Sequence, residues 1–137
     1  MSKPCREFFS PASLPPAAGY SHVAKVNKGT MIYVAGQVSS DASGNLIGEG
    51  DFDAQVEQVF RNLKTAVEAA GATMADLVKV NYFLAAEVDQ SAVTRLRAIR
   101  NHYLNVAHPP ASTLVVVTRL ARPGWLIEVE AVAAIEA

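Results

Sequence analysis

Two acidic side chains near the carboxyl end of the chain are the first candidates for chemistry. Glu128 and Glu130 stand in the otherwise apolar stretch 125–135. Side chains alternate along a strand, so both carboxylates fall on one face with Leu126, while Ile127 and Val129 fall on the other. A carboxylate in such a partly apolar setting is suited to general acid and base catalysis on a bound water. The alternative, which alternation alone favours, is that both are solvated residues on an outer strand face.

Two hydroxyl side chains form a second candidate group. Ser112 and Thr113 follow Pro109-Pro110, where a stiff segment enters the apolar stretch 111–120. Hydroxyls at such an entry can bind the polar end of a ligand, although residues of this kind often satisfy nearby backbone groups instead. No Ser, His and Asp can be grouped from the sequence, so we propose no nucleophile.

The three histidines do not indicate a metal site. His22, His102 and His108 are scattered, without HExxH spacing and without a pair of cysteines. His22 follows Tyr20 closely, and both are candidates to line a pocket. The alternative for the aromatic residue is an ordinary place in the core.

Bulk properties limit the classes of function. At 137 residues, the chain is expected to form one domain, 1–137, with one core. The net charge of −1 and the lack of a basic stripe give no reason to expect nucleic acid or an anionic membrane as partner. No apolar run is long enough to span a bilayer. The lone Cys5 fits a reducing compartment, so the cytoplasm is the expected location.

Hydrophobic spacing predicts two helices. The stretch 51–70 carries apolar residues at helical intervals, with Asp51 or Asp53 as cap and Gly71 as stop. The stretch 90–104 has a weaker pattern of the same kind.

The remaining elements are predicted strands. They comprise one strand within the first 20 residues, a hairpin of 22–26 with 30–35 turning at 27–29, a strand at 77–84, and 111–120 joined to 125–135 by a turn at 121–124. This order favours an α+β fold with one mixed sheet of about six strands and two helices on one face.

One strand of that sheet predicts association. The run Leu114 to Val117 is apolar on both faces, yet two helices cover only one face of a sheet. The simplest cover for the other face is a second copy of the chain. We therefore expect a homo-oligomer, most naturally a closed ring, with a binding site in the cleft between subunits.

Taken together, the motifs resemble the RidA family, also called YjgF-type and often filed as L-PSP endoribonucleases. The resemblance covers nearly the whole chain and is carried by five stretches: 31–37 (MIYVAGQ), 55–71, 76–80, 110–120 and 127–131. It implies a chorismate-mutase-like α+β fold. It also implies a homotrimer in which the sheets form an inner β-barrel, with three clefts between neighbouring subunits.

The resemblance implies a function as well. Characterised members hydrolyse reactive enamines and imines to a ketoacid and ammonia without metal or cofactor. Glu128 matches the glutamate that positions water in the family, and the Tyr20 to His22 segment loosely matches its pocket tyrosine region. The expected ligand is accordingly a small molecule.

At three positions the chain departs from the family pattern. Ser112 stands where deaminating members have the arginine that binds the substrate carboxylate, Leu114 where a cysteine is common, and Ala35 where a serine is usual. A hydroxyl cannot replace a bidentate cation, a loss on the order of 2 to 3 kcal/mol for a 2-imino acid. The candidate replacements are Arg95, Arg97, Arg119 and Arg122.

Three functions follow as hypotheses. The first is an enamine or imine hydrolase whose substrate is not the usual 2-imino acid, or is gripped differently. The second is a trimer that binds a metabolite without turnover. The third, RNA cleavage, is disfavoured by the charge balance.

Overall fold

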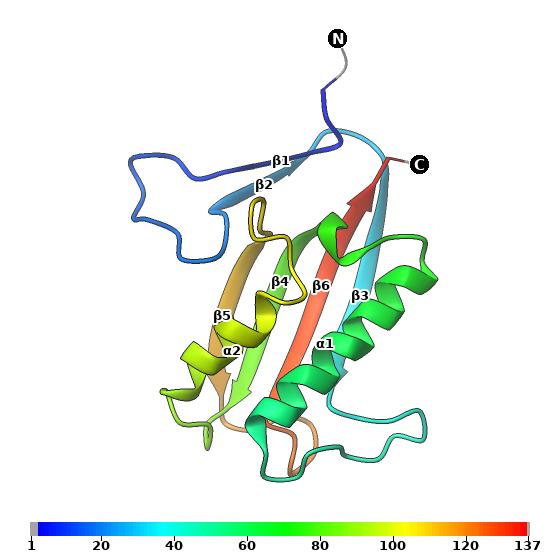
Figure 1. Ribbon diagram of the computed structural model, residues 1–137, viewed down its shortest axis with the longest axis vertical. Coiled ribbons are helices and arrows are strands. Elements are labelled where there is room, and N and C mark those ends of the chain that lie inside the picture. The colour runs from blue at the N-terminus through cyan, green and yellow to red at the C-terminus, as the bar shows by residue number, and fades with distance from the viewer. Residues whose placement is uncertain (1–2, 137) are drawn as a thin grey trace.

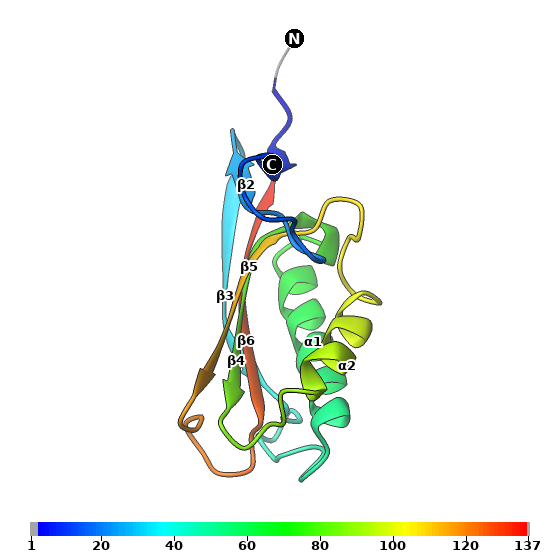
Figure 2. The ribbon, with the colours of Figure 1, turned by 90° about the vertical axis from the view of Figure 1, so that its left-hand side faces the viewer.

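The computed structural model describes residues 3–136, which form two layers (Figures 1 and 2). Two helices cover one face of a four-stranded sheet, and a two-stranded hairpin crosses one end of that sheet. The elements in chain order are β1 Arg6–Phe9, β2 Val23–Val26, β3 Thr30–Val38, α1 Phe52–Ala69, a 3-10 turn Met74–Asp76, β4 Leu77–Ala85, α2 Ala92–Arg100, β5 Ala111–Val117 and β6 Ile127–Ile135. The predicted α+β fold with two helices on one face of a mixed sheet is confirmed. The six strands of the described residues form one four-stranded sheet and one two-stranded sheet.

The sheet places the last strand near its centre. Its order is β3-β6-β4-β5, with β4 and β5 parallel and the other pairs antiparallel. A parallel pair needs a crossover connection, and α2 supplies it between β4 and β5. Strands β3 and β5 are therefore the two outer strands of this sheet.

Helix α1 forms where its sequence pattern predicts. The Asp51 carboxylate accepts a hydrogen bond from the backbone N–H of Ala54 at 3.1 Å, which caps the first turn. At the other end Gly71 has φ +86°, a conformation that favours glycine, and its N–H donates to the carbonyl of Glu68. Capping and stop signals thus fix both ends of the helix.

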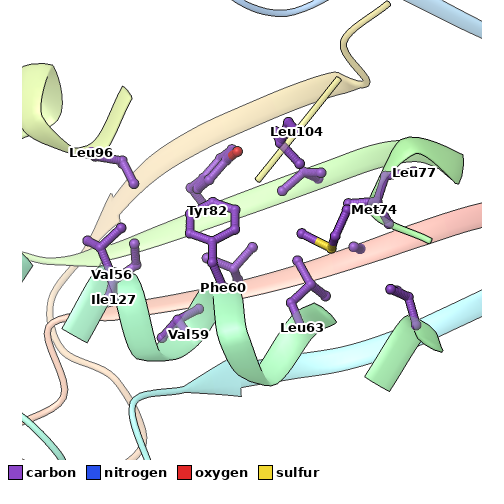
Figure 3. Packing of buried hydrophobic residues seen from close by; sticks show 14 of the residues in the cluster. Val56, Val59, Phe60, Leu63, Met74, Leu77, Tyr82, Leu96, Leu104 and Ile127 are labelled. Atoms are coloured by element: carbon purple, nitrogen blue, oxygen red, sulfur yellow. The ribbon is translucent and has the colours of Figure 1, made fainter. Parts of the chain in front are cut away.

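The core lies between α1 and the covered face of the sheet (Figure 3). Phe60 and Leu63 of α1 are fully buried against Ile127 and Val129 of β6. The Phe60 ring centroid lies 6.3 Å from that of Tyr82 on β4. The alternation predicted for 127–131 is confirmed, because the odd-numbered residues enter this core and the two glutamates do not. Leu126, expected beside the glutamates, precedes the strand and is buried in the core.

The predicted hairpin of 22–26 with 30–35 is wrong. Strand β2 pairs with β1 instead, in the register that places Phe8 opposite Ala24. Backbone and side-chain contacts at the turn explain the choice, since Asn27 donates its N–H to the carbonyl of Cys5 at 2.8 Å and its Nδ2 to Glu7 at 2.7 Å.

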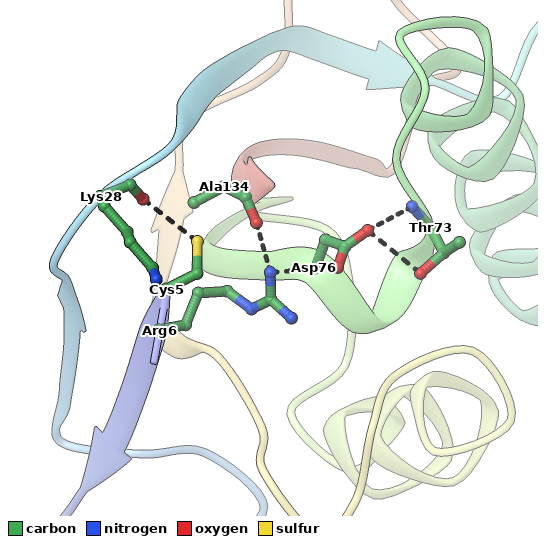
Figure 4. A network of polar contacts seen from close by, with 6 residues as sticks. All are labelled: Cys5, Arg6, Lys28, Thr73, Asp76 and Ala134. Atoms are coloured by element: carbon green, nitrogen blue, oxygen red, sulfur yellow. Dashed lines mark hydrogen bonds and ion pairs between the residues drawn. The ribbon is translucent and has the colours of Figure 1, made fainter. Parts of the chain in front are cut away.

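The β1–β2 hairpin has a small core and a polar network of its own (Figure 4). Buried Cys5 packs with Val78 and Ala134, and its thiol donates to the carbonyl of Lys28. Arg6 forms an ion pair with Asp76 at 3.1 Å and donates to the carbonyl of Ala134. These contacts join the amino-terminal hairpin to the end of the sheet.

The two carboxyl-terminal strands are present but are shorter than predicted, and they are not neighbours. Strand β4 lies between them, so the stretch 118–126 is a connection across the sheet rather than a tight turn. Helix α2 likewise covers less than the predicted 90–104, because the chain after Arg100 continues as turns.

Candidate functional site

Alternation along β5 sends the two predicted hydroxyl side chains to opposite faces of the sheet. Ser112 is in register with Val80 and Leu114 with Tyr82, both on the helix-covered face. Thr113 is in register with Asn81 on the open face. The predicted group of site residues therefore divides into two sets within one subunit.

The first set lines a pocket beside α2. Ser112, Leu114 and Tyr20 border a cavity of about 230 Å³, together with Ala18, Tyr82, Leu96, Arg97 and Arg100. No acidic side chain is among these lining residues, while two are arginines. The pocket therefore carries a local positive charge.

A pair of hydrogen bonds fastens the amino-terminal segment to this pocket. Buried Ser21 donates its N–H to the carbonyl of Pro110 at 3.2 Å and its hydroxyl to the carbonyl of Pro109 at 2.7 Å. Ser21 also forms a parallel bridge with Ala111 at the start of β5. These contacts hold Tyr20 at the wall of this pocket.

His22 packs beside Tyr20, and its role as a site residue stays a prediction. Its ring stands at the edge of the Tyr20 ring, with centroids 5.3 Å apart, and its Nε2 is 2.7 Å from the carbonyl oxygen of Pro15. It is not among the residues that line the pocket. Its contacts hold the segment around Tyr20 in shape.

The second set lies on the open face, around Glu128. The Glu128 carboxylate packs against Gly36 of β3, and a β-carbon at position 36 would overlap its Oε2. Ala35 is exposed beside that glycine. Thr113, also on this face, accepts a hydrogen bond from Lys79 Nζ at 3.1 Å.

The two glutamates on this face differ in their partners. Glu130 accepts a hydrogen bond from Asn81 Nδ2 at 3.2 Å. Within residues 3–136, no group hydrogen-bonds or ion-pairs with the half-buried carboxylate of Glu128. Of the two candidates, Glu128 is thus the one whose oxygens are available to a water or a ligand.

Sequence reasoning missed one charged residue of the pocket, Arg100, whereas Tyr82 was a candidate for its wall. Arg100 of α2 is buried, with 8% of its surface exposed, and Tyr82 is 3% exposed. Burial raises the pKa of the Tyr82 phenol to about 12, although the nearby Arg100 guanidinium partly opposes the rise. A signal was available, since Arg100 follows buried Leu96 by four residues and so shares its face of the helix.

The arginines considered as replacements for the family's arginine have other contacts. Arg95 pairs with Asp53 at 3.0 Å on the surface, and Arg122 lies over the Trp125 ring at 5.5 Å. Arg119 donates to the backbone carbonyls of residues 120 and 121. Arg97 alone of the four borders the pocket, from its exposed rim.

The described part of the chain offers neither a metal-binding cluster nor a membrane-spanning helix. Residues 3–136 contain no group of three or more His, Cys, Asp or Glu side chains arranged to hold a metal ion. Neither helix in this range is both long and apolar enough to cross a membrane.

These features define a class of small α+β protein with a pocket at one outer strand of the sheet and an available carboxylate near the other. The chain belongs to the endoribonuclease L-PSP family, whose model matches residues 11–135. The family membership predicted from the motifs is confirmed.

Three similar proteins show how far the likeness extends. Protein HMF1 of Saccharomyces cerevisiae is 36% identical over 118 residues, which cover 86% of this chain and 85% of that protein. The 2-iminobutanoate/2-iminopropanoate deaminase of Dermatophagoides farinae is 31% identical, covering 97% of this chain and 98% of its own. The crystal structure of YyfB, a protein of unknown function of the conserved Rid family from Yersinia pestis, is 31% identical, with TM-score 0.83 over 96% of this chain and 99% of its own.

Proposed function

We propose that the protein is a homotrimer that hydrolyses a small enamine or imine in a cleft between subunits. The observation that carries the proposal is the available carboxylate of Glu128, held against Gly36 inside a strand that matches the family. The deaminase of Dermatophagoides farinae, similar over 97% of this chain, supports the reaction class. A free, buried Cys5 is compatible with the cytoplasm as the location.

The surface of the sheet supports the trimer. On the open face, Tyr33 is 76% exposed and Val115 is 39% exposed, large apolar surface for a single chain to leave in water. A ring in which β5 of each subunit approaches β3 of the next would cover this face. It would also bring the Ser112 pocket of one subunit toward Glu128 of its neighbour, which neither subunit achieves alone.

In the proposed reaction, Glu128 positions a water and accepts a proton as the oxygen attacks the C=N carbon. The resulting carbinolamine receives the proton from Glu128 on its nitrogen. As the C–N bond breaks, Glu128 accepts the hydroxyl proton, the carbonyl forms, and ammonia leaves with that proton as ammonium. The products are a carbonyl compound and ammonia, so that one water is consumed for each imine. Ser112, with Leu114 and Tyr20 around it, holds the remainder of the substrate, while Thr113 and Ala35 border the Glu128 side of the cleft.

The substrate differs from that of the arginine-bearing members in one of two ways. Either it lacks the carboxylate that an arginine at position 112 would bind, or its carboxylate is bound by a residue elsewhere in the cleft. Both cases are tested by following ammonia release from freshly generated 2-iminopropionate and from an imine without a carboxylate. We expect acceleration over buffer with at least one of them.

The glutamate variants make this test specific. Glu128→Gln should lose the acceleration, while Glu130→Gln, which changes the neighbouring carboxylate on the same face, should retain most of it. Equal rates for wild type, Glu128→Gln and buffer with both imines would eliminate the proposed reaction.

A second candidate is metabolite binding without turnover. It is favoured by the three positions, Ala35, Ser112 and Leu114, at which the chain departs from the family pattern. A metabolite that raises the melting temperature and is recovered chemically unchanged would favour this candidate, and release of product would exclude it. RNA cleavage, suggested by the family's name, finds no support in a net charge of −1.

A further inference from the structure

The buried guanidinium of Arg100 lacks a counter-ion. Within residues 3–136, no carboxylate lies at ion-pair distance from it. Its Nε donates a long hydrogen bond, 3.4 Å, to Asn101 Oδ1, and its guanidinium lies near the neutral Tyr82 hydroxyl. Removing a cation from water costs free energy unless an anion or several acceptors replace the water. Arg100 of α2 is buried without such a partner, and this unfavourable arrangement suggests that its charge serves to bind a ligand.

The amino-terminal segment leaves space for the Arg100 side chain at Gly19. Gly19 has φ +77°, and a β-carbon there would overlap Arg100 Nη2. Any other residue at position 19 would therefore meet both backbone strain and a clash with the guanidinium. Ser21 hydrogen-bonds to Pro109 and Pro110. These bonds hold the segment that contains Gly19 in place over Arg100.

The pocket beside Arg100 offers further donors to an anion. The Tyr82 hydroxyl is buried with no hydrogen-bond partner in the described chain. Ser112, one strand away, is a second hydroxyl in the same pocket, and Arg97 adds positive charge at the rim. No acidic residue of the same subunit lines the pocket, so an entering anion would balance its charge.

We propose that this pocket binds the carboxylate of a small organic acid, with Arg100 as its anchor. The planar guanidinium suits the two carboxylate oxygens, and the hydroxyls of Tyr82 and Ser112 donate to the same group. At about 230 Å³ the cavity is smaller than the roughly 300 to 1,000 Å³ typical of pockets for drug-sized ligands, which favours an acid of a few carbon atoms. In this proposal the cation that binds the carboxylate is Arg100 of α2. In the deaminating members of the family it is the arginine at the position of Ser112 on β5.

The inference deepens the proposed function, because it assigns as the ligand an acid whose carboxylate is bound by a residue elsewhere in the cleft. It is tested by binding, so it can fail or succeed independently of turnover. Titration calorimetry of the whole protein would compare 2-oxobutanoate, which is stable and carries the carboxylate, with butanone, which does not. We expect 2-oxobutanoate to bind at least 10-fold more tightly, and equal affinity for the two would overturn the proposal.

Variants then locate the anchor. Arg100→Gln should weaken 2-oxobutanoate binding by about 10- to 100-fold, the loss expected for a charged hydrogen bond, and Arg100→Lys should recover part of it. Arg95→Gln removes the same charge from α2 at a surface ion pair and should leave the affinity unchanged. The Glu128→Gln variant should still bind 2-oxobutanoate, which separates the anion site from the proposed chemistry.

The same experiment also tests two other possible occupants of the pocket. Inorganic phosphate bound more tightly than 2-oxobutanoate would overturn the carboxylate assignment. The other occupant is a carboxylate of a second subunit paired with Arg100. In that case Arg100→Gln would lower the melting temperature and dissociate the oligomer. We expect neither change, because replacing a buried, unpaired charge with a neutral side chain removes a desolvation cost.

Discussion

The carboxylate of Glu128 is held against the backbone of Gly36, where a β-carbon would occupy the position of its Oε2. The contact joins β6 to β3 at the point where their pairing shifts register, between Val34 and Gln37. Gly36 does not have a positive φ, so its missing side chain matters for space rather than for backbone conformation. The sheet thereby fixes the place of Glu128, the available one of the two candidate glutamates.

Gly36→Ala is expected to displace Glu128 and to lower imine hydrolysis at least 10-fold, because an activated water depends on the position of its base. The same change should destabilise the fold by about 1 to 3 kcal/mol through overpacking, measured by urea unfolding. Adding Glu128→Ala removes the obstructing side chain, so the double variant should regain the stability of Glu128→Ala alone. Simple additivity of the two stability losses would contradict the contact.

Tyr33→Glu should dissociate the proposed trimer. Tyr33 lies on the open face of β3 and is 76% exposed in the single chain, so burying a carboxylate there would oppose association. Sedimentation velocity should show monomers for this variant and trimers for wild type. Leu14→Glu, at a residue 45% exposed in the amino-terminal segment, serves as control and should remain trimeric.

Tyr82 should make stability fall at high pH. Its folded pKa of about 12 lies above its ordinary value near 10, so between these values the unfolded chain loses the phenol proton and the folded chain keeps it. Unfolding then releases a proton, and the contribution present below pH 10 is lost as pH rises through 12, by on the order of 2 kcal/mol. Tyr82→Phe should match wild type at pH 7 and lose less stability between pH 10 and 12 in urea unfolding. Parallel losses for both proteins would contradict the assignment.

Asp51→Ala should destabilise the protein by about 1 kcal/mol, because the backbone N–H of Ala54 loses its cap. Asp51→Asn retains an oxygen acceptor and should recover most of the loss. Chemical denaturation checks both variants, and circular dichroism should show the same helix content at low denaturant. A loss for Asp51→Asn equal to that for Asp51→Ala would show that charge, not capping, is what matters.

The sequence predicts best those elements whose signals are local. Helix α1 has a capping Asp51, a stop at Gly71 and an uninterrupted apolar face, and it forms within one residue of the predicted ends. Alternation around Val129 correctly placed the glutamates away from the core. Each of these features is decided by residues close together in the chain.

Strand partners are decided by contacts between distant residues, and two predicted pairings failed for that reason. The turn after β2 looked suitable for a hairpin, yet Asn27 and Cys5 connect this strand to β1 instead. The strands β5 and β6 follow one another in the chain, while β4 separates them in the sheet. Turn composition shows that a chain reverses, not which strand it joins.

The site was predicted in part. The period of two along β5 already separated Ser112 from Thr113, although they were assigned to one group. Arg100 was overlooked because a cation on a weakly amphipathic helix is usually solvated. Its guanidinium packs against Gly19, some eighty residues earlier in the chain.

The bonds from Ser21 to Pro109 and Pro110 join parts of the chain that are 88 or more residues apart. On the ribosome, the early segment that walls the pocket has nothing to dock onto until both prolines have emerged. Ligand affinity should therefore be among the last properties that a newly made chain acquires, after α1 has formed.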